Sequence, residues 1–206
     1  GFLGPNGAGK STMMKIITGY IPQTSGLVEV NGLDVSMDSL EIRRQIGYLP
    51  EHNPLYLEMY VKEYLGHVAS IYELGKSKAR RIAEMIDLTG LGTEQNKKIA
   101  ALSKGYRQRV GIAQALIHDP KVLILDEPTS ALGVRQTANV LSTIDKVRKQ
   151  GIAVVFITHN VRHAMAVADR FTVLNRGKTL GTAQRGQITP EELQDLMAGG
   201  QELVEL

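Results

Sequence analysis

The sequence predicts an α/β fold, in which a mostly parallel sheet is flanked by helices and an inserted lobe is helical. Short apolar segments alternate with helical ones after residue 120, with strands expected over 121–125, 152–158 and 171–174 and helices over 134–149 and 161–168. This alternation is typical of parallel strands joined by helical crossovers. Between residues 57 and 88 the apolar positions follow a helical period instead, so we place the helical lobe at about 55–118.

The chain length and composition fit one domain spanning 1–206, because 206 residues are enough for a single α/β core. The 24 basic residues are scattered among 21 acidic ones, so we expect no nucleic acid as a partner. The absence of cysteine excludes disulfides and thiolate metal sites. No apolar run is long enough for a membrane helix, so any membrane role would depend on a partner.

The remaining elements are predicted from local signals. Gly1-Phe2-Leu3 resembles the end of a buried strand, so we expect that a native N-terminal segment is missing. We further predict helices over 10–18, 40–45 and 104–118, strands over 26–30, 46–49 and 178–181, and a last helix from Pro190. Thr189 is the expected N-cap of that last helix, and Ser77 a possible N-cap within the lobe.

A glycine-rich loop near the start carries the clearest functional signal. It reads Gly4-Pro5-Asn6-Gly7-Ala8-Gly9-Lys10-Ser11-Thr12 and matches the phosphate-loop pattern G-x-x-x-x-G-K-[ST]. The glycines let backbone N–H groups surround a polyphosphate, and the following helix adds its positive dipole end. We expect Lys10 to reach the β- and γ-phosphates and Ser11 to hold Mg²⁺. The alternative is a glycine-rich turn before a helix; the functional reading predicts a P-loop NTPase.

Two carboxylates follow the apolar segment at 122–125. Asp126 and Glu127 would stand at the carboxyl end of a strand, where open α/β sheets bind ligands. Asp126 is placed to hold Mg²⁺, and Glu127 to orient or deprotonate the attacking water. An acidic pair can also act as a helix cap, which leaves that alternative open.

The order of these motifs resembles the nucleotide-binding subunits of ABC transporters over essentially the whole chain. The resemblance rests on the phosphate loop, on Leu102-Ser103-Lys104-Gly105-Tyr106-Arg107-Gln108-Arg109, on Asp126-Glu127-Pro128-Thr129 and on Phe156-Ile157-Thr158-His159. Residues 102–106 stand where the family usually has L-S-G-G-Q, which binds the γ-phosphate of the opposite subunit's ATP. Ser103 and Gly105 retain that chemistry, whereas Lys104 and Tyr106 depart from the pattern. Without its neighbours, this segment would be a serine-capped helix.

Three further positions take their expected roles from the resemblance. His159 matches the histidine that contacts the γ-phosphate and helps to place the water, although a lone histidine is more often structural. Glu51 stands where many members have a glutamine that touches Mg²⁺ and links the site to the membrane partner; the alternative is an acidic residue of a surface loop. Gly133 stands where the family usually has an aspartate that helps to join the two subunits.

The two halves resemble different branches of the family. The first part, up to about residue 121, is similar to exporter-type ATPases, including those of gliding-motility systems, at residues 46–56 and 102–120, whereas the later part, from 131 through 203, resembles ATPases of monosaccharide importers. We therefore expect a hybrid, either recombined or assembled.

The resemblance implies a Mg²⁺-dependent ATPase that dimerises head-to-tail, traps ATP and drives a transmembrane permease from the cytoplasmic face of the membrane. The alternatives are a soluble ABC ATPase that acts on ribosomes or DNA, and a fragment that binds nucleotide without hydrolysing it.

Overall fold

The computed structural model describes residues 1–199 and contains short strands interleaved with helices. The strands are β1 (Phe2–Leu3), β2 (Glu29–Val30), β3 (Leu33–Asp34), β4 (Ile46–Leu49), β5 (Val122–Asp126), β6 (Ala153–Thr158), β7 (Arg170–Asn175) and β8 (Lys178–Gln184). The α-helices are α1 (Lys10–Ile17), α2 (Ser39–Gln45), α3 (Val61–Ile71), α4 (Lys78–Leu88), α5 (Lys104–Leu116), α6 (Val134–Lys149), α7 (Val161–Val167) and α8 (Pro190–Met197). Two 3₁₀ turns, η1 (Gly75–Ser77) and η2 (Ile99–Ala101), complete the described elements.

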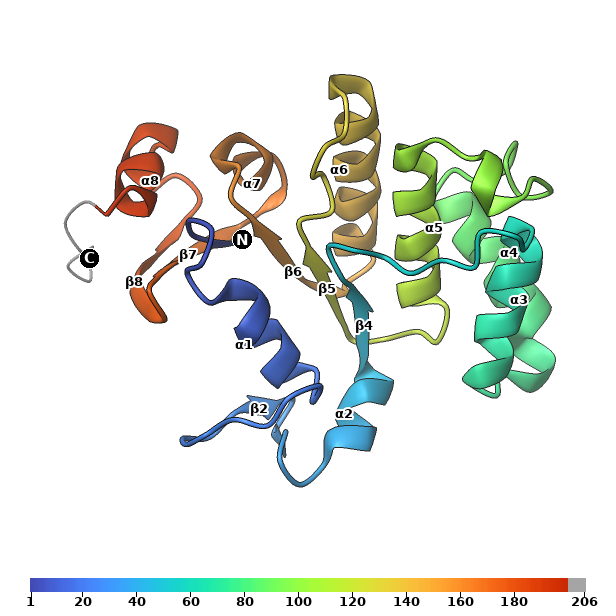
Figure 1. Ribbon diagram of the computed structural model, residues 1–206, viewed down its shortest axis with the longest axis horizontal. Coiled ribbons are helices and arrows are strands. Elements are labelled where there is room, and N and C mark those ends of the chain that lie inside the picture. Colours follow the sequence, from blue (N-terminus) through green and yellow to red (C-terminus); the bar gives the residue numbers. More distant parts are fainter. Residues whose placement is uncertain (200–206) are drawn as a thin grey trace. The chain divides into compact units, whose positions relative to one another are not determined.

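The main sheet has six strands in the order β4-β5-β6-β1-β7-β8. β1 is parallel to both β6 and β7, and only the hairpin partner β8 is antiparallel to β7 among the pairs with a defined register in this sheet. The two-stranded β2-β3 hairpin is separate. The predicted fold class, a mostly parallel sheet flanked by helices, is therefore confirmed (Figure 1).

Contacts divide the chain into two compact units. The first contains residues 1–43, 124–127 and the part from 155 onward. Its core surrounds β1, because Leu3 is fully buried and pairs with strands on both sides. Phe171 on β7 and Phe156 on β6 are also fully buried. This unit holds the phosphate loop and the carboxyl ends of β5 and β6.

The second unit contains residues 44–123 and 128–154. Within it α3, α4 and α5 pack against one another, and α5 also packs against α6 (Figure 1). Hydrogen bonds tie the helices together: Tyr64 on α3 donates to Gln114 on α5 at 2.6 Å, and Arg81 on α4 donates to the carbonyl of Leu116 at 2.7 Å. The helical lobe predicted at about 55–118 corresponds to α3, α4 and α5 of this unit.

Most predicted elements are present with boundaries shifted by one to three residues, but two local expectations are wrong. The strand expected over 26–30 is reduced to Glu29–Val30. Ser77 is not an N-cap, because its hydroxyl donates to the Leu74 carbonyl at 2.7 Å and its backbone is already helical. Ser103 and Thr189 do cap α5 and α8, respectively. The sequence resemblance at 197–203 continues past the described residues.

Among residues 1–199, no helix is long and apolar enough to cross a membrane.

One close contact in the second unit predicts a sensitive position. A Cβ at Gly47 on β4 would lie 2.1 Å from the backbone carbonyl oxygen of Ala115, so Gly47→Ala forces the strand and α5 apart. We expect the free energy of unfolding to fall by roughly 1–3 kcal/mol or more, as for other overpacked cores, which a urea titration would measure.

Gly92→Ala is the matched control, because a Cβ there would meet nothing within 4 Å. Its unfolding midpoint should stay at or slightly above that of the parent chain. Equal midpoints for the two variants would contradict the close packing of β4 on α5.

Candidate functional site

The phosphate loop leaves the sheet at the end of β1 and leads directly into α1. Gly7 and Gly9 have φ values of +78° and +99°, in the left-handed region that favours glycine. Gly4 is required for a different reason, because a Cβ there would lie 2.2 Å from the carbonyl oxygen of Leu174 on β7. The loop also donates and accepts locally: Ala8 N–H donates to the Pro5 carbonyl, and the Ala8 carbonyl accepts from Gly177 N–H at 2.9 Å. The predicted phosphate loop is thus a tightly turning backbone segment that packs against β7.

Lys10 is unusually buried for a lysine, with 7% of its surface exposed. Its ammonium donates to the carbonyl oxygens of Gly4 and Pro5 at 2.8 and 2.9 Å. These two hydrogen bonds hold the Lys10 ammonium against the backbone of the phosphate loop. Ser11 and Thr12 follow in the first turn of α1, where backbone N–H groups have no partner within the helix.

Strand register brings three loops to one edge of the sheet. Leu3 on β1 pairs with Thr158 on β6 in parallel register, so the residues that follow them, Gly4 and His159, leave the sheet together. β5 is the other neighbour of β6, and Glu127 N–H donates to the Ile157 carbonyl at 3.0 Å. The phosphate loop, His159 and the two carboxylates therefore all belong to this edge of the first unit.

Glu127 is held in place by β6. One carboxylate oxygen, Oε2, accepts from the Thr158 hydroxyl at 3.1 Å. The other, Oε1, accepts from the backbone N–H of His159 at 2.8 Å and also lies 2.8 Å from His159 Nδ1. Glu127 is 7% exposed and has φ of +47°, an uncommon value for a residue with a side chain. Such backbone strain occurs preferentially at functional sites.

The contact with Glu127 fixes how the His159 ring presents its two nitrogens. An ionised carboxylate only accepts hydrogen bonds, so Nδ1 must carry the proton, and the neutral ring then leaves Nε2 as an acceptor. The His159 side chain is 54% exposed, whereas that of Glu127 is 9% exposed. The histidine is therefore the solvent-facing member of the pair.

His163 lies close enough to sense both members electrostatically. Burial lowers the pKa of His163, the Glu127 charge acts to raise that pKa, and His159 acts to lower it. Its backbone N–H donates to the Asn160 side chain, which caps α7. The two histidines belong to different elements, because His159 follows β6 and His163 is in α7.

Thr158 is the functional residue that sequence reasoning missed. It is fully buried, donates its hydroxyl to Glu127 and accepts a hydrogen bond from Asn160 N–H at 3.0 Å. The available signal was a hydroxyl residue placed last on an apolar strand, directly before His159. A threonine is common in strands, so this signal does not distinguish a packing residue from a carboxylate partner.

The predicted metal ligands of this unit are Ser11 and Asp126. Asp126 ends β5 and is 3% exposed. Within residues 1–199 no group of three or more His, Cys, Asp or Glu side chains could hold a metal ion. The Ser11 hydroxyl and the Asp126 carboxylate are oxygen donors that fit Mg²⁺, which is usually held by one or two carboxylates together with water and substrate phosphates.

The second unit carries the predicted serine-capped segment. Ser103 accepts a hydrogen bond from Tyr106 N–H at 3.4 Å and caps α5. A Cβ at Gly105 would lie 2.8 Å from Cγ of Gln136, and a Cβ at Gly133 would lie 2.5 Å from the Oε1 atom of the same residue. Gln136, on α6, therefore fills the space that both glycines leave free. Ser103, Gly105 and Gln136 line one side of a cavity of about 330 Å³.

Tyr106, which departs from the family pattern, is held by a contact with Arg109. The Arg109 guanidinium lies 4.1 Å from the centre of the Tyr106 ring, within cation–π range. Arg109 also donates to the carbonyls of Thr89 and Gly90 at 3.2 and 3.1 Å, where α4 ends. The tyrosine is thereby tied through Arg109 to the neighbouring helix.

Glu51 is exposed in the loop after β4. It lines a cavity of about 610 Å³ together with residues that include His52, Leu57 and the cationic Lys104 and Arg107. Glu51, Ser103 and Gly105 belong to the second unit, whereas the phosphate loop, Asp126, Glu127 and His159 belong to the first.

A phosphate loop after a central parallel strand, with a buried acid pair at the end of β5 two strands away, is typical of the P-loop NTPase class. The sequence profile of the family described as "ABC transporter" matches residues 1–130. The chain belongs to the ABC transporter family and corresponds to its ATP-binding part.

Individual relatives agree with this family. An uncharacterized ABC transporter ATP-binding protein of Synechocystis sp. is 36% identical over 98% of this chain and 58% of the relative. The dimeric, ADP- and phosphate-bound structure of the ATP-binding cassette MJ0796 matches with a TM-score of 0.79 at 26% identity, covering 91% of this chain and 85% of that one. The structure of cbiO1 from Clostridium perfringens, part of the ABC transporter complex cbiONQ, matches with a TM-score of 0.82 at 25% identity, covering 96% and 78%. The chain spans about half to three-fifths of the length of the curated relatives it matches.

The contact between Gly105 and Gln136 yields a test of why a glycine stands at position 105. If space for Gln136 is the reason, Gly105→Ala should unfold more easily by roughly 1–3 kcal/mol, and adding Gln136→Ala should restore only part of that loss, because it removes Cγ, at 2.8 Å, but leaves Cβ, at 2.9 Å. Urea unfolding of the two single variants and the double variant would measure this coupling.

Nucleotide-dependent activity should be followed in the same set. A double variant that regains stability but not activity would indicate that position 105 must lack a side chain so that a ligand can approach the backbone. No recovery of stability would contradict the packing explanation.

Proposed function

We propose that this chain binds and hydrolyses ATP and that its hydrolysis drives transport by a membrane permease. The observation that carries the proposal is the Glu127 carboxylate, buried and held by Thr158 and His159 at the edge where the phosphate loop leaves the sheet. A carboxylate fixed beside a polyphosphate site is suited to orient and deprotonate water. Family membership supports the same activity.

On binding ATP, Lys10 of the phosphate loop would exchange its present hydrogen-bond acceptors for phosphate oxygens. Residues 4–12 supply glycine-rich backbone and the N-terminus of α1, which favour an anion. The Lys10 ammonium now donates to two carbonyls of its own loop. The β- and γ-phosphates would replace these neutral acceptors with charged ones, which make stronger hydrogen bonds. Lys10 is thus already held near the position where its charge is required.

Mg²⁺ would be held by the Ser11 hydroxyl and the Asp126 carboxylate, with Glu51 as a further oxygen ligand acting directly or through water. Bound there, the ion would neutralise charge that develops on the phosphate oxygens. This assignment leaves Glu127 for the water molecule. The Asp126 carboxylate precedes Glu127 directly and ends the strand whose neighbour carries Thr158 and His159.

In the reaction, Glu127 would accept a proton from the attacking water while His159 contacts the γ-phosphate. The proton on His159 Nδ1 faces Glu127, so the ring can follow changes in the charge of that carboxylate. Thr158 and the His159 backbone N–H keep the carboxylate from turning away. Fixed donors of this kind stabilise developing charge without having to reorganise during the step.

A second ATPase subunit would complete the site. Ser103 and the N-terminal N–H groups of α5 form a helix start suited to a γ-phosphate supplied by a partner arranged head-to-tail. The dimeric MJ0796 structure supports a second subunit. Gly133, in place of the usual aspartate, makes room for Gln136 instead, so this side chain replaces the aspartate at the expected subunit contact.

The permease would contact the second unit beside Glu51. The cavity there combines apolar Leu55 and Leu57 with the cations of Lys104 and Arg107, so it suits a polar and apolar segment of a partner. The relative cbiO1, described as part of a transporter complex, supports a membrane partner. In this proposal the chain would work at the cytoplasmic face of the membrane, attached through its permease.

Replacing the water-activating group should separate binding from hydrolysis. Glu127→Gln keeps the shape, and its amide can donate to the Thr158 hydroxyl while its oxygen accepts from His159 N–H, so ATP affinity should stay within about threefold while the hydrolysis rate falls by at least ~10²-fold. Thr158→Val should give a smaller loss, because it frees one carboxylate oxygen without removing the base. Rates from phosphate release and affinities from a fluorescent ATP analogue would check both.

An unchanged rate in Glu127→Gln would remove Glu127 from this role. A parent chain that binds ATP without measurable hydrolysis would point to the fragment alternative.

The metal assignment predicts a shift in Mg²⁺ requirement. Ser11→Ala and Asp126→Ala should each raise the Mg²⁺ concentration that gives half-maximal hydrolysis by about tenfold or more, because each removes an oxygen ligand. Glu51→Gln should shift it much less, since an amide oxygen is retained. Equal shifts for all three variants would contradict the division of roles, and titration of hydrolysis against Mg²⁺ at fixed ATP would decide.

A further inference from the structure

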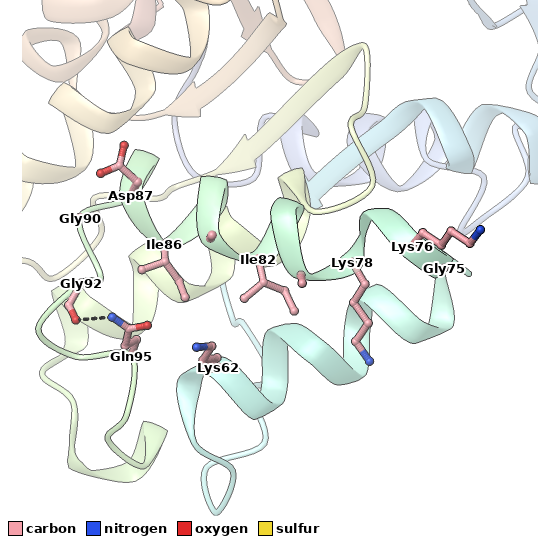
Figure 2. A pocket seen from close by; sticks show the side chains of 12 residues that line it. Lys62, Gly75, Lys76, Lys78, Ile82, Ile86, Asp87, Gly90, Gly92 and Gln95 are labelled. Carbon is pink, nitrogen blue, oxygen red and sulfur yellow. Dashed lines mark hydrogen bonds between the residues drawn. The ribbon is translucent and has the colours of Figure 1, made fainter.

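A groove in the helical lobe is not used by any step proposed above. It is a cavity of about 700 Å³ bounded by α4, by Lys62 near the start of α3 and by the turns at each end of α4 (Figure 2). All of its lining residues belong to the second unit. The Ser103 and Glu51 cavities have different linings, so this groove is a separate feature of the lobe.

The centre of the groove is apolar. Ile82 and Ile86 lie one helical turn apart on α4 and point into it (Figure 2). Ala79 and Ala83 also line the groove and are exposed, whereas the two isoleucines are only 7% and 6% exposed. The apolar floor therefore consists of two exposed alanines and the edges of two isoleucines, beside a second helix, and the apolar side of another helix can pack on such a floor.

The rim of the groove is cationic. Lys62, Lys76 and Lys78 line it, against one carboxylate, Asp87, at the far end of α4. Lys78 Nζ donates to the Ser70 hydroxyl at 2.7 Å, and none of the three lysines has an ion-pair partner within residues 1–199.

Two other lysines of the lobe have carboxylate partners. Lys97 bonds to Glu94 at 2.9 Å and Lys98 to Glu58 at 3.2 Å. The three groove lysines have no such partner in the described part of the chain, which favours an anionic occupant through charge complementarity.

Both ends of the groove are open. Gly75 lies at one end and Gly92 at the other, and a Cβ at either position would meet nothing within 4 Å. An enclosed small-molecule site needs walls at its ends. Open ends instead allow a chain segment to enter along α4 and to continue past it.

We propose that this groove, defined by Lys62, Lys76, Lys78, Ile82 and Ile86, docks an acidic amphipathic helix of a partner protein. Apolar residues of that helix pack on Ala79, Ala83 and the edges of Ile82 and Ile86, and carboxylates on both sides of its apolar stripe pair with the three lysines. The distance from Lys78 to Asp87 along α4 is roughly 14 Å at 1.5 Å per residue, so a helix of about three turns covers it. The docking is independent of ATP hydrolysis.

Selection from a displayed library of random peptides about 14 residues long, sufficient to span the groove, tests the proposal with the whole chain as target. We expect enriched peptides to carry Asp and Glu on both sides of a Leu or Ile stripe. Their affinity, measured by fluorescence anisotropy, should fall roughly tenfold in the Lys62→Glu, Lys76→Glu, Lys78→Glu triple variant, the combined effect of three exposed ion pairs.

Two further variants separate the groove from general charge. Lys97→Glu, Lys98→Glu and Lys146→Glu make the same change of net charge at exposed lysines outside the groove, and this control should bind the peptides almost as the parent does. Ala83→Trp leaves the charges in place and should block binding by filling the groove. Thermal unfolding of each variant verifies that it is folded.

Three results would overturn the proposal: selection that enriches no acidic peptides, binding that is equal in the two triple variants, or binding that persists in Ala83→Trp. Vesicles of phosphatidylglycerol and phosphatidylcholine form the remaining arm. Sedimentation with these vesicles that depends on the groove lysines, in the absence of peptide binding, would assign the surface to an anionic membrane and overturn the protein-docking proposal.

Discussion

The pairing of Leu3 with Thr158 on one side and with Val173 on the other is the constraint on which the candidate site depends. A strand of only two residues has little stability of its own. Placed between two longer parallel strands, it has a fixed register, and that register sets where the phosphate loop begins. A shift by one residue would turn Leu3 out of the core and move Lys10 relative to the end of β6. The register of β1 in the sheet therefore determines the position of the phosphate loop.

Much of this arrangement could be predicted from the sequence, because its signals are local. The spacing of glycines before Lys10 predicts a phosphate loop, and the apolar run before Asp126 predicts a buried strand with acids at its end. The caps at Ser103 and Thr189 follow from the residues next to them. Ser77 has the same local signal but a different outcome, since η1 runs directly into α4 and leaves no extended residue for a cap.

Contacts between distant residues could not be predicted in this way. The hydrogen bond from Thr158 to Glu127 joins residues 31 positions apart and depends on β6 lying beside β5. The packing of Gln136 over Gly105 depends on how α5 meets α6, and neither residue signals it alone. In both cases the residue type permits several roles, and the neighbour across the fold decides which one it takes. The assignment of the two halves to different branches of the family stays a prediction.

The position of Gln136 over two glycines also affects the order in which this region can change during evolution. A side chain at residue 133 meets the flexible end of Gln136, which can rotate away, whereas one at residue 105 meets its Cβ as well as its Cγ, and rotation of the side chain does not move Cβ. An aspartate could therefore be accepted at position 133 first, with a shorter residue at 136 following as a refinement. Position 105 has no such freedom, because even an alanine at residue 136 would keep a Cβ 2.9 Å from a Cβ at residue 105. The two glycines look alike in the sequence, yet one is a reversible substitution and the other is locked by its neighbour.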